Sequence, residues 1–213
     1  MLLQDVWNLL SRDLFSIPST DTLFNQYRDS DPVFDRSSGA SIRRQNLKKY
    51  LESYSAFPKV FLIGEAPGFH GCRFSGVPFT SEQQLVSPNS LPFSGRQSSV
   101  GVAPRHERTA DVFWQVMRPH FPEFLVWNIV PFHPHKSNDH MSNRNPSASE
   151  AKRFEGIIKT MASIIQPRII IAIGKTAEHS LARWQLKYET IRHPSHGGSA
   201  KFALAIPRYF NRE

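Results

Sequence analysis

The chain has 213 residues, 39% of them hydrophobic and 12% aromatic, which is enough to bury one sizeable core and too few for two ordinary domains. We therefore expect residues 1–213 to form one domain, with a helical N-terminal part at 1–58 and a core at 59–200. The 26 Lys and Arg outnumber the 18 Asp and Glu and give a net charge of +8, which favours a partner with a phosphate backbone but locates no site. The single cysteine, Cys72, excludes an internal disulfide and any cluster or zinc centre held by several thiolates.

The sequence favours neither export nor membrane insertion. Its first eighteen residues include Asp5, Arg12 and Asp13 and lack an uninterrupted apolar stretch, which is unlike a secretory signal. No segment approaches the roughly 20 apolar residues that a membrane span requires. These features predict a cytoplasmic protein with no membrane partner, which we expect to be a monomer.

Four apolar runs predict strands. The run 60–63 ends in Gly-Glu-Ala-Pro-Gly, and the run 124–130 ends in Pro-Phe-His-Pro, so both are typical of buried strands whose carboxyl ends become loops. Residues 168–173 form a third run, stopped by Gly174, and residues 188–191 form a weaker fourth.

Helices are expected in the intervals between these strands. One is predicted over 109–117 and another after Gly174. The segment 147–150, Ser-Ala-Ser-Glu, is a capping box that begins an amphipathic helix. The apolar positions of that helix are Ala151, Phe154, Ile157, Ile158, Met161, Ile164 and Ile165. Residues 86–105 are rich in Ser, Pro and Gly without a clear period, so we expect a long surface loop there.

The alternation of strands and helices predicts an α/β fold, a three-layer α/β/α sandwich around a central, mainly parallel, four-stranded sheet. In open parallel sheets, ligands bind outside the carboxyl ends of the strands. Three of the four predicted strands run there into unusual segments, GEAPG, WNIVPFHPH and RHPSHGG. We therefore expect these three segments to converge in one cleft.

Two residues of the first segment and the loop after it are candidates for that cleft. Glu65 lies on a tight Gly-Pro turn directly after a strand, although such turns also occur as structural punctuation around a solvated acid. Phe79 follows on the loop that leaves the turn. A phenylalanine is usually part of a core, but here it is also a candidate platform for a flipped base, because base–aromatic stacking contributes about 1–3 kcal/mol per base.

The second segment offers an amide and two histidines, and a third histidine follows shortly after it. Asn128 lies at a strand end, where a side-chain amide can donate to and accept from the Watson–Crick edge of a base; the alternative is a buried Asn that the protein itself satisfies. His133, His135 and His140 suggest a metal site, but their spacing matches no helical ligand pair and no group of cysteines assists. We expect no metal and no other cofactor.

The third segment and the start of the last predicted helix suit phosphate groups. His193 is fixed by the proline after it and is followed by Ser195 and glycine amides, a donor-rich loop suited to a nucleic-acid backbone, although a lone histidine is often structural. Gly174 and Lys175 do not belong to a P-loop, because Ile169 stands where that motif needs its first glycine. At a helix start they can still hold a DNA phosphate.

In this order, the segments resemble the uracil-DNA glycosylase superfamily, in which a G-x-x-P-G-type motif, a central asparagine segment and an HPS motif follow one another. The resemblance covers residues 59–200. GEAPG with a following PFT, and the segment 143–146, Asn-Arg-Asn-Pro, are similar to the branch that carries an iron–sulfur cluster, but that branch needs several cluster cysteines and this chain has one. GFHGCRFSGVPF resembles the single-strand-selective and broad-specificity branches, so we expect a cluster-free, bacterial-type relative that acts at the nucleoid.

The resemblance implies roles residue by residue. Glu65 takes the position that handles the attacking water, and His193 the position that donates to the leaving base. Substrate binding is implied for Gly64, Ala66, Gly68, Phe79 and Asn128, and DNA binding for Gly174, Lys175, Ser195, His196 and Gly197.

The implied reaction is hydrolysis of the N-glycosidic bond of uracil, or a related deaminated base, in DNA. Alternatives are a preference for hypoxanthine or xanthine, and a non-catalytic binder of damaged or single-stranded DNA. Gly68 stands where the strictly uracil-specific branch has an aromatic ring against C5 of the base, so we expect an open wall that admits small 5-substituents, unless Gly68 serves a turn with positive φ. The loop 196–198 lacks a bulky wedge, which favours unpaired bases.

Overall fold

Four apolar runs form the central sheet of the computed structural model, which describes residues 1–195 and 197–210. They are β2 (Val60–Gly64), β3 (Phe124–Asn128), β5 (Ile169–Ile173) and β6 (Glu189–Ile191). The strands lie in the order β3-β2-β5-β6, and every neighbouring pair is parallel. The predicted α/β class with a parallel four-stranded sheet is confirmed, and the strands differ from the predicted runs only at their ends.

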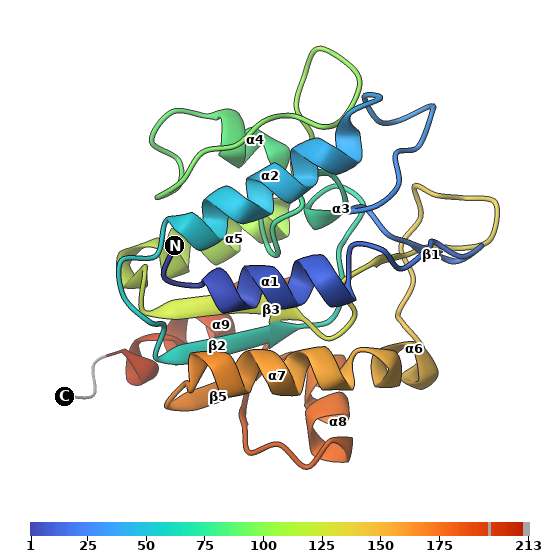
Figure 1. The fold of residues 1–213 in the computed structure, drawn as a ribbon. Helices are drawn as coiled ribbons and strands as arrows, with labels where there is room; N and C mark the ends of the chain where they lie inside the picture. Colours follow the sequence, from blue (N-terminus) through green and yellow to red (C-terminus); the bar gives the residue numbers. More distant parts are fainter. Residues whose placement is uncertain (196, 211–213) are drawn as a thin grey trace.

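Helices cover both faces of the sheet (Figure 1). The chain crosses the sheet in one direction from β2 to β3 and in the other from β3 to β5, and right-handed crossovers place the helices of these two connections on opposite faces. In Figure 1, α7 (Glu155–Ile165) packs against α1 (Gln4–Asp13) in front of the strands, and α9 (Ser199–Ala205) lies behind them. α5 (Arg108–Met117) contacts α9 through an aromatic pair with ring centroids 5.9 Å apart. This is the predicted three-layer arrangement.

The other helices are placed around these layers, and a second small sheet joins the N-terminal part to the loop after β3. The helices are α2 (Gly39–Glu52), α3 (Cys72–Ser75), α4 (Glu82–Val86), η1 (Arg118–His120), α6 (Ala148–Arg153), α8 (Lys175–Arg183) and η2 (Pro207–Tyr209). In the small sheet, β1 (Leu23–Phe24) pairs antiparallel with β4 (His133–Pro134). The N-terminal part, expected to be helical, therefore also contributes a strand.

The predicted helix after Ser147 begins as expected and is interrupted once. The Ser147 hydroxyl accepts a hydrogen bond from the Glu150 amide at 3.2 Å, and the Glu150 carboxylate accepts one from the Ser147 amide at 2.7 Å, which completes the capping box. At Phe154 the backbone leaves helical geometry, with φ −104° and ψ 2°, and α6 gives way to α7. The buried Phe154 ring packs edge-on against Phe132, with centroids 5.1 Å apart. We attribute the interruption to this core contact.

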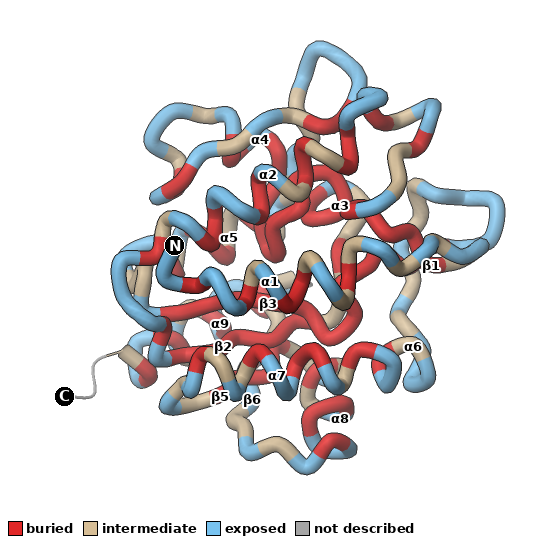
Figure 2. The backbone as a smooth tube through the Cα atoms, viewed as in Figure 1, coloured by how far each residue is buried: buried red, intermediate tan, exposed pale blue. Residues whose placement is uncertain are grey.

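The strands form the centre of the core. β2 and β3 are buried at every position (Figure 2).

In the segment 86–105, predicted as a surface loop, Ser98 and Ser99 are buried and donate their amides to the buried Glu82 carboxylate at 2.6 and 2.9 Å. The expectation holds for the exposed tip around Val102 and is wrong for the anchored base. Within the described part of the chain, no helix is long and apolar enough to cross a membrane.

A buried charge cluster joins the N-terminal part to α3. The side chains of Asp35, Arg43 and Arg73 have no exposed area, and the Asp35 carboxylate lies 3.1 Å from Arg43 Nη2 and 2.5 Å from Arg73 Nη1. The rings of Phe24 and Phe74 lie 4.3 and 4.2 Å from the Arg73 guanidinium carbon. Because water is excluded, removal of Asp35 would take away the only carboxylate in ion-pair contact with either guanidinium group among the described residues.

We expect Asp35→Asn, which keeps the size of the side chain, to lower the free energy of unfolding by about 3–5 kcal/mol. The matched control is Asp13→Asn, which disrupts an exposed pair with Arg12 and should cost less than about 1 kcal/mol. Denaturant titration at pH 7 measures both variants. Equal losses in the two variants would contradict the role given to Asp35.

Candidate active site

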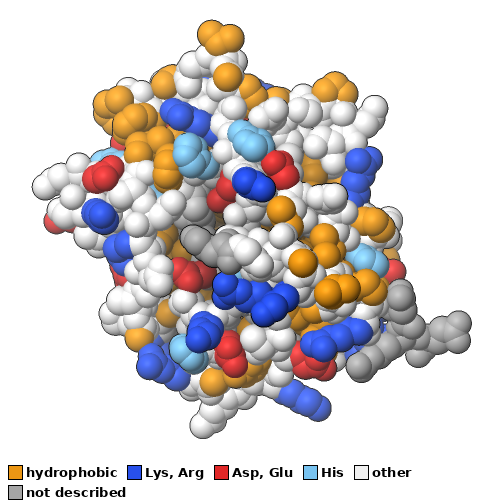
Figure 3. Space-filling view, turned by 180° about the vertical axis from the view of Figure 1, so that it is seen from behind, with side chains coloured by type: hydrophobic (Ala, Val, Ile, Leu, Met, Phe, Trp, Pro, Cys, Tyr) orange, Lys and Arg blue, Asp and Glu red, His pale blue; other side chains and the backbone are white. Residues whose placement is uncertain are grey.

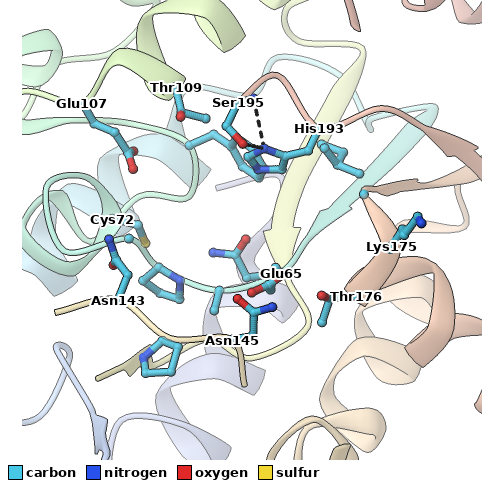
Figure 4. Close-up of a pocket in the computed structure, with 18 of the residues that line it drawn as sticks. Glu65, Cys72, Glu107, Thr109, Asn143, Asn145, Lys175, Thr176, His193 and Ser195 are labelled. Atoms are coloured by element: carbon cyan, nitrogen blue, oxygen red, sulfur yellow. Dashed lines mark hydrogen bonds between the residues drawn. The ribbon is translucent and has the colours of Figure 1, made fainter. Parts of the chain in front are cut away.

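The carboxyl ends of the strands surround a cavity of about 500 Å³ (Figure 4). Glu65 follows β2, Asn128 is the last residue of β3, and His193 lies in the segment that leaves β6. All three line the cavity, as does Gly174 after β5. The structure therefore brings the three predicted segments together in one cleft.

Gly64 allows two functional side chains to share one wall of this cavity. In the parallel register, Gly64 lies opposite Asn128. A Cβ atom on Gly64 would overlap the Phe79 ring and would lie 2.8 Å from Asn128 Oδ1. A side chain at this position would displace one or both groups, so the first glycine of GEAPG is explained by close packing.

The Asn128 side chain is buried at the cavity wall. The residue is 3% exposed, and no group among residues 1–195 and 197–210 hydrogen-bonds to its side-chain amide. Because the side chain lines the cavity, its amide is open to whatever fills that space. Asn128 is therefore suited to a ligand that presents a donor and an acceptor on one edge.

Phe79 has a strained backbone at the same wall. Its φ of 52° lies in the left-handed region that bulky residues rarely adopt. The ring stacks on Phe113 of α5, with centroids 4.7 Å apart, and lies 5.6 Å from the His193 ring. Strain of this kind persists where surrounding structure fixes it and is concentrated at functional sites. The conformation places the Phe79 ring between Gly64 and His193.

Hydrogen bonds from Ser195 define the tautomer of His193 (Figure 4). The Ser195 amide donates to His193 Nδ1 at 3.2 Å, and the Ser195 hydroxyl lies 2.7 Å from the same nitrogen. A backbone amide can only donate, so Nδ1 is an acceptor and the neutral ring carries its proton on Nε2. Gly174, with φ 86°, gives room beside this ring, because a Cβ there would lie 3.3 Å from His193 Cβ. In this tautomer, His193 is a hydrogen-bond donor through Nε2.

The turn that carries Glu65 is fixed through its backbone. The Gly64 and Glu65 carbonyls accept hydrogen bonds from two successive amides after β3, at 2.9 and 3.0 Å. The buried His133 ring donates from Nδ1 to the Pro67 carbonyl at 2.8 Å. Within the described part of the chain, the Glu65 carboxylate has no hydrogen bond or ion pair, and it lines the cavity. This carboxylate is therefore accessible to a ligand.

The start of α8 provides groups suited to an anion at the cavity rim. Gly174, Lys175 and Thr176 line the cavity. The first amides of a helix have no intrahelical partner, and the helix dipole favours negative charge there. Figure 3 shows further Lys and Arg side chains on the face of the molecule turned away in Figure 1, in keeping with the net charge of +8.

Of the remaining predicted residues, some line the cavity and others do not. Ala66, Gly68 and Ser195 line the cavity, whereas the exposed Gly197 does not. His196 lies outside the described residues. The cavity is also lined by residues that the sequence did not single out for it: Cys72, Glu107, Thr109, Asn143, Asn145, Thr176 and Arg192. The Asn-Arg-Asn-Pro motif was a signal for two of these, but nothing in the pattern marked Glu107.

The wall at Gly68 is not open, which corrects the expectation from sequence. A Cβ atom on Gly68 would lie 2.7 Å from Glu107 Oε1, and one on Gly71 would overlap the same carboxyl group. Gly68 does not have a positive φ, so the alternative explanation is wrong as well. The expectation failed because a residue far along the chain places a carboxyl group against this glycine.

The histidines after β3 take part in hydrogen bonds that orient the loop. Besides the bond from His133, His135 donates from Nδ1 to the Lys136 carbonyl at 2.9 Å, and His140 Nδ1 lies 2.7 Å from an Asp31 carboxylate oxygen. Among the residues that the structure describes, no group of three or more His, Cys, Asp or Glu could hold a metal ion.

Comparison with known proteins gives one family and one fold. The model of the uracil DNA glycosylase superfamily matches residues 51–213. No curated protein matches the chain significantly. Among solved structures, the chain is similar to wild-type Pedobacter heparinus SMUG2, with 16% sequence identity and a TM-score of 0.63 over 98% of this chain and 95% of that chain. At this identity, the likeness shows a shared fold.

The environment of His133 predicts a pH dependence of stability. Burial lowers the pKa of His133 from 6.5 to about 4. As the pH falls below 6.5, His133 is protonated in the unfolded chain before it is protonated in the folded protein. The contribution of His133 to the unfolding free energy is therefore complete above pH 6.5 and is lost as the pH falls towards 4. We expect this residue to account for about 3 kcal/mol of the loss of unfolding free energy between pH 7 and pH 4. Urea titration of the wild type and His133→Asn at both pH values measures it, and an equal loss in both proteins would contradict this account.

Proposed function

We propose, from the premise that the chain belongs to the uracil DNA glycosylase superfamily, that it hydrolyses the N-glycosidic bond of uracil in DNA and leaves an abasic site. Members of this superfamily are DNA glycosylases. The observation that carries the proposal is the Asn128 side chain, a 3% exposed amide with no hydrogen-bond partner in the described chain, at a cavity also lined by Glu65 and His193.

The residues around the cavity match the needs of an ejected uracil. The base presents N3–H and O4 on one edge, and the Asn128 amide can accept from the first and donate to the second. The Phe79 ring offers an aromatic face, and stacking of this kind contributes about 1–3 kcal/mol. Uracil is ejected because its glycosidic bond is inaccessible inside a duplex.

The charges that develop during hydrolysis account for the two catalytic residues. As the glycosidic bond breaks, positive charge develops on the sugar and negative charge on the departing uracil. The Glu65 carboxylate stabilises the sugar cation and orients the attacking water. His193 donates from Nε2 to uracil O2, and one preorganised donor of this kind lowers the barrier by about 3 kcal/mol. The proton on Nε2 follows from the Ser195 hydrogen bond to Nδ1.

The DNA backbone is held at the rim of the cavity. We assign phosphate contacts to the Gly174 and Lys175 segment at the start of α8, and to Ser195 and Gly197 in the loop after β6. His196 belongs to the same loop by sequence. With glycines where a bulky wedge would force a duplex open, we expect a preference for unpaired uracil. The proposal includes a monomeric enzyme that acts on DNA in the cytoplasm.

A preference for hypoxanthine or xanthine is the second candidate, because a cavity of about 500 Å³ has room for a bicyclic base. A non-catalytic binder of damaged or single-stranded DNA is the third. Product analysis over a panel of deaminated bases distinguishes all three candidates.

We expect the purified protein to release uracil from a single-stranded oligonucleotide in the presence of excess chelator, because the proposed residues need no metal for the chemistry. Alkaline cleavage of the abasic product, resolved on a gel, measures the reaction, with oligonucleotides containing hypoxanthine and xanthine assayed beside it. If none of these bases is released after prolonged incubation with excess protein, the enzyme proposal is wrong.

We expect Glu65→Gln and His193→Ala each to slow excision by about 10²- to 10³-fold with nearly unchanged DNA affinity, because both groups act mainly on charge in the transition state. Single-turnover rates at saturating protein measure the chemical step. Glu123→Gln and His120→Ala are matched controls, since both residues lie just before β3, at the opposite end of the strands. A wild-type rate in either test variant would remove that residue from the mechanism.

A further inference from the structure

Glu107 directs its side chain into the cavity from the start of α5 (Figure 4). It occupies the N-cap position of that helix, but its side chain makes no capping hydrogen bond. Glutamate is also not among the residues that serve well as N-caps. The residue type and its orientation are therefore not explained by the helix that it precedes.

The carboxyl group of Glu107 forms the wall of the cavity next to GEAPG. Its Oε1 lies 2.7 Å from where a Cβ of Gly68 would be, and a Cβ on Gly71 would overlap the same group. The Asn143 side chain also lies near Gly68, with Oδ1 4.0 Å from the same Cβ position. The carboxyl group can occupy this position because neither Gly68 nor Gly71 has a side chain.

No other residue in the described chain satisfies this carboxyl group. It has neither a hydrogen bond nor an ion pair within residues 1–195 and 197–210. The side chain is half-buried and lines the cavity, so its carboxyl group is open to whatever fills that space. The position therefore suits a group that contacts whatever fills the cavity.

The surroundings of Glu107 favour its neutral form. Burial, and then the nearby Asp111 carboxylate, raise the pKa of Glu107 from 4.5 to about 7, while His106 acts in the opposite sense. Burial also raises the pKa of the Cys72 thiol, which lines the cavity beside Glu107. Near neutral pH, a large fraction of Glu107 is protonated and can both donate and accept a hydrogen bond.

We propose that Glu107 is a specificity-determining residue, which contacts the C5–C6 edge of an ejected pyrimidine through its carboxyl group at the wall formed by Gly68 and Gly71. This inference rests on the proposed function. There, His193 contacts O2 and Asn128 contacts N3 and O4, so C5–C6 is the edge left for another wall. A base with a hydrogen-bonding group at C5 is favoured, and a base with a methyl group there is disfavoured.

The protonation state of Glu107 changes the reaction in a defined direction. The neutral carboxyl group tolerates the negative charge that develops on the leaving base, whereas the ionised group repels it. Excision by the wild type should therefore fall, relative to a variant that does not titrate, as the pH rises through the pKa of Glu107.

The test uses single-stranded oligonucleotides with uracil, 5-hydroxyuracil or thymine, the last two having C5 groups of similar size. Single-turnover rates are measured from pH 5.5 to 8.5 for the wild type, Glu107→Gln and Glu107→Leu, with a thermal melt of each protein. Glu107→Gln keeps the hydrogen-bonding groups without the titration, and Glu107→Leu removes both. Asp111→Asn serves as a fourth protein, because loss of the neighbouring charge should lower the pKa of Glu107 and move the pH dependence to lower pH.

We expect the ratio of wild-type to Glu107→Gln rates on uracil to fall about tenfold across this pH range, with a midpoint at about 7. We expect Glu107→Leu to lose about tenfold of the preference for 5-hydroxyuracil over thymine. A flat ratio together with an unchanged preference in a folded Glu107→Leu would overturn this inference while leaving the glycosylase proposal intact. A wild type that releases none of the bases would overturn both.

Discussion

The site depends on the register between β2 and β3. Gly64 ends β2 directly opposite Asn128 at the end of β3, so the two strands deliver the GEAPG turn and the asparagine to one edge of the sheet. A Cβ atom at Gly64 would overlap the Phe79 ring and crowd the Asn128 amide. The base platform, the base-reading amide and the carboxylate of the next residue are thus placed by one glycine in a parallel pair. A shift of the register by one residue would exchange the faces on which these groups lie.

Hydrogen bonds around the cavity keep this arrangement in place. His133 ties the GEAPG turn to the loop after β3, and Ser195 fixes the ring of His193. The loop that carries two cavity asparagines is held by Arg144, which donates to both carboxylate oxygens of Glu150 at 2.5 and 2.9 Å. The Arg144 hydrogen bonds are the main cause that lowers the pKa of Glu150, to about 2. The GEAPG turn, the His193 ring and the asparagine loop are therefore held by partners within the protein.

The sequence predicted those parts of the site that local patterns encode. Strand ends are marked by apolar runs and Gly-Pro turns, so the sequence alone places Glu65, Asn128 and His193 in one cleft. The pattern could not place Glu107, because the contact with Gly68 joins two loops far apart in the chain. It also missed β1 and β4, which are too short for a recognisable period, and the interruption at Phe154, which a buried ring produces inside an otherwise regular helical pattern.

The central claim is that an ejected uracil lies between Phe79, Asn128 and His193. It is tested most directly by a crystal structure with a single-stranded oligonucleotide that carries a 2′-fluorinated, cleavage-resistant deoxyuridine. The account predicts the base inside the cavity, with the Asn128 amide within hydrogen-bond distance of N3 and O4 and His193 Nε2 within that distance of O2. A structure in which the uracil binds outside this cavity while the DNA is well ordered would contradict it.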